Sequence, residues 1–416
     1  MVLAMARTRP TRVEGVRRRP KDRKAQIARA SAEAFSALGY HGVTMEDIAS
    51  RVGVSATALY RHYSGKYELF RGAVLSLGQQ LVDATDFAEL SDPADPRGDL
   101  ARIVSALADT ALANRESGGL YRWEGRFLSD DDEAELNRQM RTVHQRIHRP
   151  LAALRPGLSS RERWTRSTAV LSVIGSIVDH HARLPTARIR ALLAELTMAI
   201  ATSDFVVPAD DAPPRVPPSR PMPESKYEAL LEESMRLFNE KGYRDTSVEE
   251  IAAAVGLPAS GVYRYFARKS DLLAAPFRRA ADWLSAEVAA DTSTARDPED
   301  ALTTVIDAYV GRSFERPELA YVYYTERLNM TVADRNVLRR LQRSTVEAWV
   351  ELVVAVRPEW TASDARFAVH AAMALVVDIG RLTDYRDTAQ TRAMVSTLLD
   401  LTLLGRYRLR MALPAR

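Results

Sequence analysis

Two polar clusters of the same kind occur in this chain, and both could hydrogen-bond to phosphates and to the edges of nucleotide bases. The first comprises Thr44, Ser55, Thr57, Tyr60, Arg61, His62 and Lys66, and the second comprises Ser247, Ser260, Gly261, Tyr263, Arg264, Tyr265 and Lys269. Hydroxyl and ammonium groups reach phosphate oxygens, and an arginine can bind guanine through two hydrogen bonds. Small residues at the start of a helix allow its end to approach the bases. These residue types therefore indicate a surface that contacts nucleic acid.

The elements that must position these clusters are written twice along the chain. Segments Phe35–Phe70 and Phe238–Leu273 align without insertion or deletion at a constant offset of 203 residues. In each copy an amphipathic helix ends at a glycine, a short helix follows, a second glycine makes a turn, and a third helix begins. This order is typical of a helix-turn-helix, in which the polar face of the last helix points outwards. We expect two such units.

Local signals mark the ends of the short helices. Thr44 and Ser247 are placed to cap the second helix of each copy, and each has a carboxylate three residues later, as in a capping box. Ser55 is placed to cap the third helix of the first copy. Pro258 replaces it in the second copy, where we expect a first-turn proline.

Both copies resemble the DNA-binding domain of TetR-family regulators. They share the pattern I-A-x-x-x-G-x-x-x-x-x-[LV]-Y-x-[HY]-[FY]-x-x-K-x-x-L, in which a tyrosine precedes an aromatic pair and a lysine. The resemblance implies that the two polar clusters contact DNA, whereas Tyr63 and Phe266 pack inside the motif. A helical stretch of the length expected for a ligand-binding and dimerisation domain follows each copy, so the resemblance extends over nearly the whole chain.

This resemblance implies an all-α fold of two tandem units arranged as an intramolecular pseudo-dimer. The expected division is a basic N-terminal arm (1–23), DNA-binding domain 1 (24–70), ligand-binding/dimerisation domain 1 (71–206), a Pro-rich linker (207–224), DNA-binding domain 2 (225–273) and ligand-binding/dimerisation domain 2 (274–411). Apolar stretches near 159–181, 186–204, 363–382 and 388–410 are expected to form the interface. Family members with a single unit form homodimers, and here the two reading helices differ in sequence. We therefore expect an imperfect, asymmetric inverted repeat as the target.

Composition agrees with a protein that contacts DNA. The net charge is +4, and residues 1–24 carry nine basic side chains against two acidic ones. This arm either neutralises phosphates or is a solvated tail, and composition does not separate the two. The chain has no cysteine, no secretory signal and no apolar run long enough to span a bilayer, so we expect a cytoplasmic protein without membrane contact.

Aromatic and arginine side chains in the helices after each motif are candidates for a ligand pocket. They are Tyr121, Trp123, Arg126, Phe127 and Trp164 in the first half, and Tyr309, Tyr321, Tyr324, Arg327 and Trp349 in the second. Aromatics at helical spacing are more often core than pocket. An unidentified small-molecule effector, of apolar or acyl type, would bind there.

Signals for catalysis are absent. The sequence has no Gly-rich phosphate loop, no G-x-S-x-G and no H-E-x-x-H, so we expect no enzyme, no cofactor and no metal site. His144 and His148, four residues apart, could meet the 179–181 segment around a metal, but histidines of this kind are more often hydrogen-bonded or solvated. The expected function is a DNA-binding regulator, a repressor released by ligand. The alternatives are a binder with one working head, a helical ligand-binding protein and a helical enzyme. The fused chain could also pair again as a homodimer.

Overall fold

The computed structural model describes residues 20–90, 94–208 and 225–406. These residues form eighteen α-helices and four 3₁₀ segments, and they contain no β-strand. No helix among them is long and apolar enough to cross a lipid bilayer. Most of the basic arm (1–19), most of the Pro-rich linker (209–224) and the last ten residues lie outside the described ranges. The all-α prediction is confirmed.

The first half of the chain runs through nine α-helices. Their bounds are α1 Pro20–Gly42, α2 Met45–Val52, α3 Ala56–Tyr60, α4 Lys66–Ala84, α5 Pro96–Ala113, α6 Gly119–Trp123, α7 Asp130–Leu154, α8 Ser160–Gly175 and α9 Thr186–Thr202. Three 3₁₀ segments lie between them, η1 Asp86–Leu90, η2 Gly125–Phe127 and η3 Ser176–Val178.

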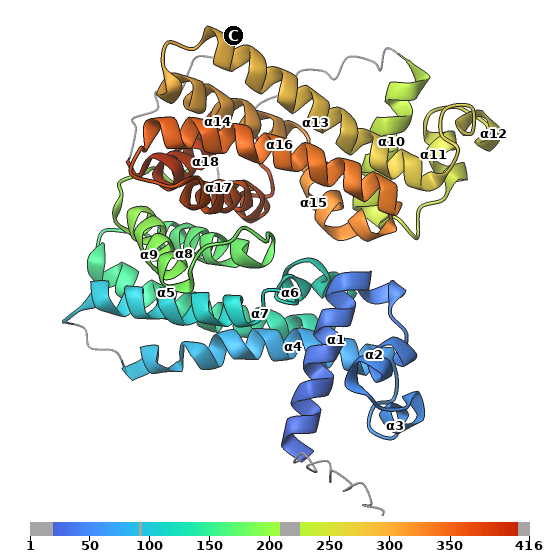
Figure 1. Ribbon diagram of the computed structural model, residues 1–416, viewed down its shortest axis with the longest axis horizontal. Helices are drawn as coiled ribbons and strands as arrows, with labels where there is room; N and C mark the ends of the chain where they lie inside the picture. The colour runs from blue at the N-terminus through green and yellow to red at the C-terminus, as the bar shows by residue number, and fades with distance from the viewer. Residues whose placement is uncertain (1–19, 91–93, 209–224, 407–416) are drawn as a thin grey trace, which may run out of the picture.

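The second half repeats this order. Its helices are α10 Lys226–Lys241, α11 Val248–Ala254, α12 Ala259–Val262, α13 Lys269–Thr294, α14 Pro298–Glu315, α15 Pro317–Glu326, α16 Val332–Val356, α17 Ala362–Leu382 and α18 Ala389–Leu404, with the 3₁₀ segment η4 Arg327–Asn329. Helices α7 and α16 occupy equivalent positions at an offset of 202 residues. In Figure 1 the blue-to-green first half lies below the yellow-to-red second half.

The predicted caps explain where the short helices begin. Thr44 and Ser247 each accept a hydrogen bond from the backbone three residues on, in complete capping boxes. Ser55 accepts from the N–H of Ala58 at 3.2 Å and starts α3. The prediction for Pro258 was wrong by one position: it is the N-cap residue of α12, with φ −69° and ψ 152°, and lies outside the first turn. It has no side chain that could accept a capping bond, so α12 starts without one.

Each helix-turn-helix, which we call a head, has its own apolar core. In the first head Phe35, Ile48 and Leu59 are buried together with residues of α4 and α7. In the second head Phe238, Ile251 and other buried residues pack in the same way against α13 and α16. The long helices α4 and α13 thus belong to a head at one end and to the body at the other.

The bodies of the two halves share one continuous core. It contains Ile147 and Val173 from the first half together with Trp349, Leu375 and Leu398 from the second, all of them buried. Helix α8 packs on α17 and α9 packs on α18, and these green and red helices meet in the middle of Figure 1. They are the segments for which the sequence analysis expected an interface. Burying apolar surface between the halves stabilises their association.

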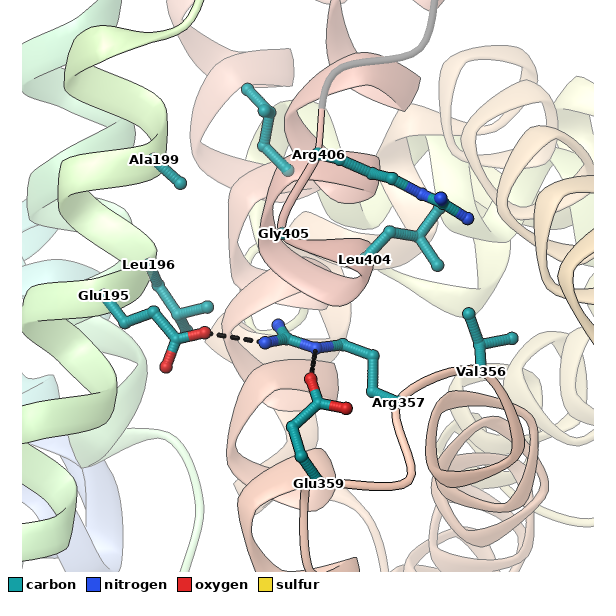
Figure 2. Close-up of a pocket in the computed structure, with 10 residues that line it drawn as sticks. Glu195, Leu196, Ala199, Val356, Arg357, Glu359, Leu404, Gly405 and Arg406 are labelled. Carbon is teal, nitrogen blue, oxygen red and sulfur yellow. Dashed lines mark hydrogen bonds and ion pairs between the residues drawn. The ribbon is translucent and has the colours of Figure 1, made fainter.

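Ion pairs reinforce this junction at its outer ends. Arg357, at the end of α16, lies 2.8 Å from Glu195 of α9 and 2.8 Å from Glu359, as Figure 2 shows beside a small cavity. Its guanidinium also lies 3.5 Å from the ring centroid of Trp360. A second pair joins Arg188 of α9 to Asp364 of α17 at 2.7 Å. The two halves are therefore joined by charge as well as by apolar contact.

Candidate functional site

The outer face of each head presents polar side chains to solvent. Tyr60 is 54% exposed, Tyr263 is 55% exposed and Tyr265 is 46% exposed, which is unusual for such large side chains. Thr57, Arg61, His62, Ser260 and Arg264 are also exposed. Within the described ranges, Arg61 and Arg264 make no ion pair and no side-chain hydrogen bond. The fold thus leaves these groups available to an external partner.

Other residues predicted to contact DNA are engaged inside the head. The hydroxyl of Thr44 is 2.7 Å from the Asp47 carboxylate and that of Ser247 is 3.0 Å from the Glu250 carboxylate, within the capping boxes. The Ser55 hydroxyl is the cap of α3. These three side chains therefore position the reading helix, whatever else they contact.

The two lysines of the motif lie over aromatic rings. The ammonium nitrogen of Lys66 is 4.7 Å from the Tyr40 ring centroid, and that of Lys269 is 4.3 Å from the Tyr243 ring centroid. Burial lowers the pKa of both lysines. These cation–π contacts hold the start of α4 and of α13 against the end of the first helix of each head.

Gly261 departs from the prediction. It is buried, and a Cβ placed on it would lie 3.5 Å from Pro258 Cδ and 3.6 Å from Leu257 Cβ. It therefore allows α12 to pack closely on the preceding loop, and it does not lie on the outer face. Tyr63 is half-buried and Phe266 is buried, in agreement with the packing role expected for both.

Each head is tied to the body by a buried glutamate that the sequence analysis did not single out. The backbone N–H of Tyr40 donates to Glu124 at 3.1 Å, and that of Tyr243 donates to Glu326 at 3.2 Å. The preceding glycine has φ +73° in the first head and +85° in the second. Burial raises the pKa of Glu124. The sequence contained one signal for these residues: the same amino acid, glutamate, occurs in both copies at positions that correspond at the offset of 202.

The contacts around these two glutamates differ in the residue that the opposite half contributes. Arg126, predicted to line a ligand pocket, lines the cavity between the two heads, where it lies 2.7 Å from Glu326 and donates to the carbonyl of Thr325 at 2.9 Å. In the mirrored position Leu328 approaches Gly39, and a Cβ on that glycine would be 3.3 Å from Leu328 Cδ1. The second head is thus held by a charged contact between halves, and the first by an apolar one.

Three more residues predicted for a pocket, Trp123, Tyr309 and Trp349, line none of the cavities described below, whereas Phe127 lines the cavity between the two heads. Trp123 donates to Asp179 at 2.9 Å and its ring stacks on Tyr324 of the other half at 4.2 Å. Phe127 stacks on a ring of the first head, and Tyr309 and Trp349 pack against each other at 5.4 Å, with Trp349 fully buried. Their spacing along helices reflects packing.

A cavity of about 500 Å³ lies between α4, α5, α7 and α8 of the first half, and Asp378, Arg381 and Leu382 of the second half complete its lining. The predicted pocket residues Tyr121 and Trp164 line it, among aliphatic and polar side chains in similar numbers. His144 also lines it, stacked on Trp164 at 4.3 Å, and burial lowers the pKa of His144 to about 4. Arg122, at the edge, pairs with Asp378 of the second half at 2.9 Å. This cavity has the size and the lining of a small-molecule site.

The second half has a larger cavity of about 840 Å³, to which the first half contributes part of the wall. Tyr324 and Arg327 line it, whereas Tyr321 lines a third cavity of about 470 Å³ between the two heads. His144 and His148 both contact the hydroxyl of Ser167, at 2.8 and 2.9 Å. In the part of the chain that the structure describes, no three metal-binding side chains gather.

Comparisons with known proteins agree with the geometry of the heads. The family model of bacterial regulatory proteins of the tetR family matches residues 27–73 and again residues 230–275. HTH-type transcriptional activator FasR of Mycolicibacterium smegmatis is 38% identical over 93 residues, which are 22% of this chain and 42% of that protein. HTH-type transcriptional regulator TtgR of Pseudomonas putida is 31% identical over 84 residues, 20% of this chain and 40% of that protein. The chain thus spans about two fifths of the length of these curated relatives.

Among solved structures, the ketosteroid transcriptional regulator KstR2 of Mycobacterium tuberculosis aligns with a TM-score of 0.39 and 19% identity, over 44% of this chain and 96% of that one. The two curated relatives are named as transcriptional regulators. The two separate matches to the family model coincide with the two heads described above. Both heads therefore match the tetR family of bacterial regulatory proteins, and the chain carries two tandem units of this type.

Proposed function

We propose that the protein is a sequence-specific DNA-binding transcriptional regulator, a repressor that a small ligand releases from its operator. The observation that carries the proposal is the pair of exposed polar faces on α3 and α12, where Arg61 and Arg264 have no partner within the described residues. Arginine and tyrosine on the outer face of such a helix can contact base edges and phosphates. In this proposal residues 24–70 and 225–273 read DNA, and residues 71–206 and 274–411 bind ligand and hold the halves together.

The arrangement of the heads supports an internal pseudo-dimer. Both heads lie at the same end of the molecule (Figure 1), on opposite sides of the shared core. A dimer of helix-turn-helix units reads half-sites about one helical turn apart, roughly 34 Å. Because His62 stands where the second head has Tyr265, the two half-sites differ in this proposal, and the operator is an imperfect inverted repeat.

A route from ligand to head exists in the first half. Helix α4 starts under the head, where Phe70 is buried in the head's core, and its later residues Leu77 and Leu81 line the cavity. Tyr121 lines the same cavity three residues before Glu124, which holds the backbone of Tyr40. A ligand that prefers one position of these elements shifts the spacing of the heads by its differential affinity. The aliphatic part of the lining favours an apolar or acyl-type effector.

A second candidate function has one specific observation in its favour. Helix α12 has four residues against five in α3, and its N-cap Pro258 provides no side-chain hydrogen bond. A head with a less supported reading helix could serve as a structural or ligand-sensing partner. The chain would then bind DNA through the first head alone, and two chains would be needed to read a palindrome.

Footprinting of the full chain on its genomic DNA at base resolution tests the proposal, together with Arg61→Ala and Arg264→Ala. We expect one protected region with two unlike half-sites. Each substitution should weaken binding about tenfold, by loss of contacts in its own half-site. Loss of affinity only in Arg61→Ala would favour the single-headed alternative. Unchanged affinity in both variants would refute the assignment of the reading faces. Transcription from the same operator, with and without effector, then gives the sign of regulation.

A further inference from the structure

We propose that the cavity of the second half, which we call the arginine groove, binds a small phosphorylated anion with at least two anionic groups, unlike the apolar ligand proposed for the first half. This inference rests on the proposed function, because it names the effector class of the second ligand-binding domain. The two cavities correspond in part, because α16 and α17 line the second where α7 and α8 line the first, whereas α13 and α14, the equivalents of α4 and α5, do not line the second. Asn137 and Trp164 line the first, and the residues 202 positions later, Arg339 and Arg366, line the second.

The arginine groove has more positively than negatively charged side chains, and the carboxylates that line it do not pair with all of its arginines. Six arginines and three carboxylates line it, whereas two arginines and one carboxylate line the first cavity. Arg366 is paired with Glu347 at 2.6 Å, and Arg115 is held by backbone carbonyls of His180 and Ala182. The remaining four arginines have no carboxylate within 4.0 Å in the part of the chain described: Arg327, Arg335, Arg339 and Arg343.

The unpaired arginines are arranged along one edge of the groove. Arg335, Arg339 and Arg343 recur every four residues on α16, so they share one face of that helix. Four residues of helix rise about 6 Å, so the three positions extend over about 12 Å. Planar guanidinium groups bind phosphate oxygens through paired hydrogen bonds. A row of this length can bind several anionic groups of one molecule at the same time, which favours a ligand with more than one such group.

Another part of the groove is lined by aromatic rings. His180 of the first half stacks on His370 of α17 at 4.2 Å, and burial lowers the pKa of both imidazoles. Tyr323 and Tyr324 also line the groove. Uncharged rings beside a row of guanidinium groups suit a ligand that has a ring at one end and phosphates at the other. A nucleoside diphosphate is the simplest molecule of this kind.

The groove is built from both halves, which gives its ligand a means to act. The 178–182 segment of the first half and α15, α16 and α17 of the second all line it, and so does Ala37 of α1 in the first head. An anion held between these elements would fix the first head relative to the second half. The protein would then respond to two chemically different ligands, one in each half.

Calorimetric titration of the full chain without DNA tests this inference independently of operator binding. The probes are ADP, inorganic pyrophosphate and AMP, and the variants are Arg339→Gln and Arg340→Gln. Arg340 neighbours Arg339 on the same helix, is exposed, and does not line the groove, so it is the matched control for lost charge. We expect ADP and pyrophosphate to bind more tightly than AMP. Arg339→Gln should weaken ADP binding roughly tenfold, and Arg340→Gln less than twofold.

Three results would overturn the inference. The first is no binding of ADP or pyrophosphate at millimolar concentration. The second is an equal loss in both variants, which would indicate diffuse attraction. The third is a loss of operator affinity by Arg339→Gln without any anion present, which would place these arginines on DNA. Anion binding with no effect on DNA affinity would support the site. It would contradict only the control of DNA binding by this ligand.

Discussion

The guanidinium of Arg126 lies 2.7 Å from the carboxylate of Glu326, and this contact joins the first half to the base of the second head. The same carboxylate accepts the backbone N–H of Tyr243 at 3.2 Å. The equivalent of Arg126 in the second half is Leu328, which faces Gly39. The two heads therefore rest on the body through contacts of opposite chemistry, although their folds are the same.

Replacing Arg126 tests how much this contact stabilises the protein. Arg126→Leu leaves the Glu326 carboxylate, which is 3% exposed, without its cationic partner. Removing one member of a buried pair costs about 3 kcal/mol or more, because the remaining charge is desolvated without compensation. Urea denaturation measures this loss. The double variant Arg126→Leu with Glu326→Gln should regain most of it, and a cost near zero for the single variant would contradict the role of the pair.

Gly39→Ala and Gly72→Ala should change stability in opposite directions. Gly39 has φ +73° and ψ 162°, a region that side chains rarely adopt, and we expect a loss of about 1–3 kcal/mol. Gly72 is exposed within α4, and a Cβ there would meet nothing within 4 Å. Alanine at that position should therefore stabilise the helix by about 0.5–1 kcal/mol. Thermal unfolding of both variants gives the comparison, and an unchanged or increased stability of Gly39→Ala would show that Gly39 is not strained.

Two threonines of the first head should separate folding from DNA binding. The hydroxyl of Thr44 caps α2, so Thr44→Ala should lower the unfolding free energy by about 1 kcal/mol. Thr57 is exposed on α3, and Thr57→Ala should change stability by less than about 0.5 kcal/mol. In the proposed function Thr57→Ala lowers operator affinity in an electrophoretic mobility assay. A stable Thr57→Ala variant with full operator affinity would show that Thr57 does not contribute to DNA binding.

Acidification should destabilise the protein through its buried imidazoles. Burial lowers the pKa of His370 to about 4, below the value of about 6.5 in an unfolded chain. Between these two values the unfolded state binds more protons than the folded one, so stability falls as the pH decreases from about 6.5 to 4. The slope is at most about 1.4 kcal/mol per pH unit for each such imidazole. The neighbouring groups are His180, Arg115, Arg366 and Glu347.

Denaturation at pH 7 and pH 5 measures this effect in the parent protein, in His370→Asn and in His62→Asn. The difference between the two pH values should shrink in His370→Asn, because one group that protonates on unfolding has been removed. His62 is exposed on the reading face, so its replacement serves as the control. An unchanged difference in both variants would exclude His370 as a source of the acid sensitivity.

The heads were predictable from sequence because their signals are local. A carboxylate three residues after Thr44 or Ser247 defines a capping box, and Gly53 has the left-handed conformation expected at a turn. The apolar periodicity of the long helices is also local. The all-α architecture and the order of its helices follow from such short-range patterns.

The ligand sites were less predictable, since a buried aromatic residue on a helix has the same spacing in a core and in a pocket. Trp349 and Tyr309 pack against each other in the shared core, whereas Trp164 lines a cavity. The contact between Arg126 and Glu326 joins residues 200 positions apart. No local pattern indicates which face of one half will meet the other.

The shared core has a consequence for how this protein can change over generations. In a homodimer every substitution appears twice, so a residue that suits one side of the symmetry axis must also be tolerated on the other. Here Arg126 and Leu328 occupy equivalent places but are encoded at separate positions of one chain, so each can be substituted without the other. Each half can therefore acquire substitutions of its own while the other half keeps the earlier residue.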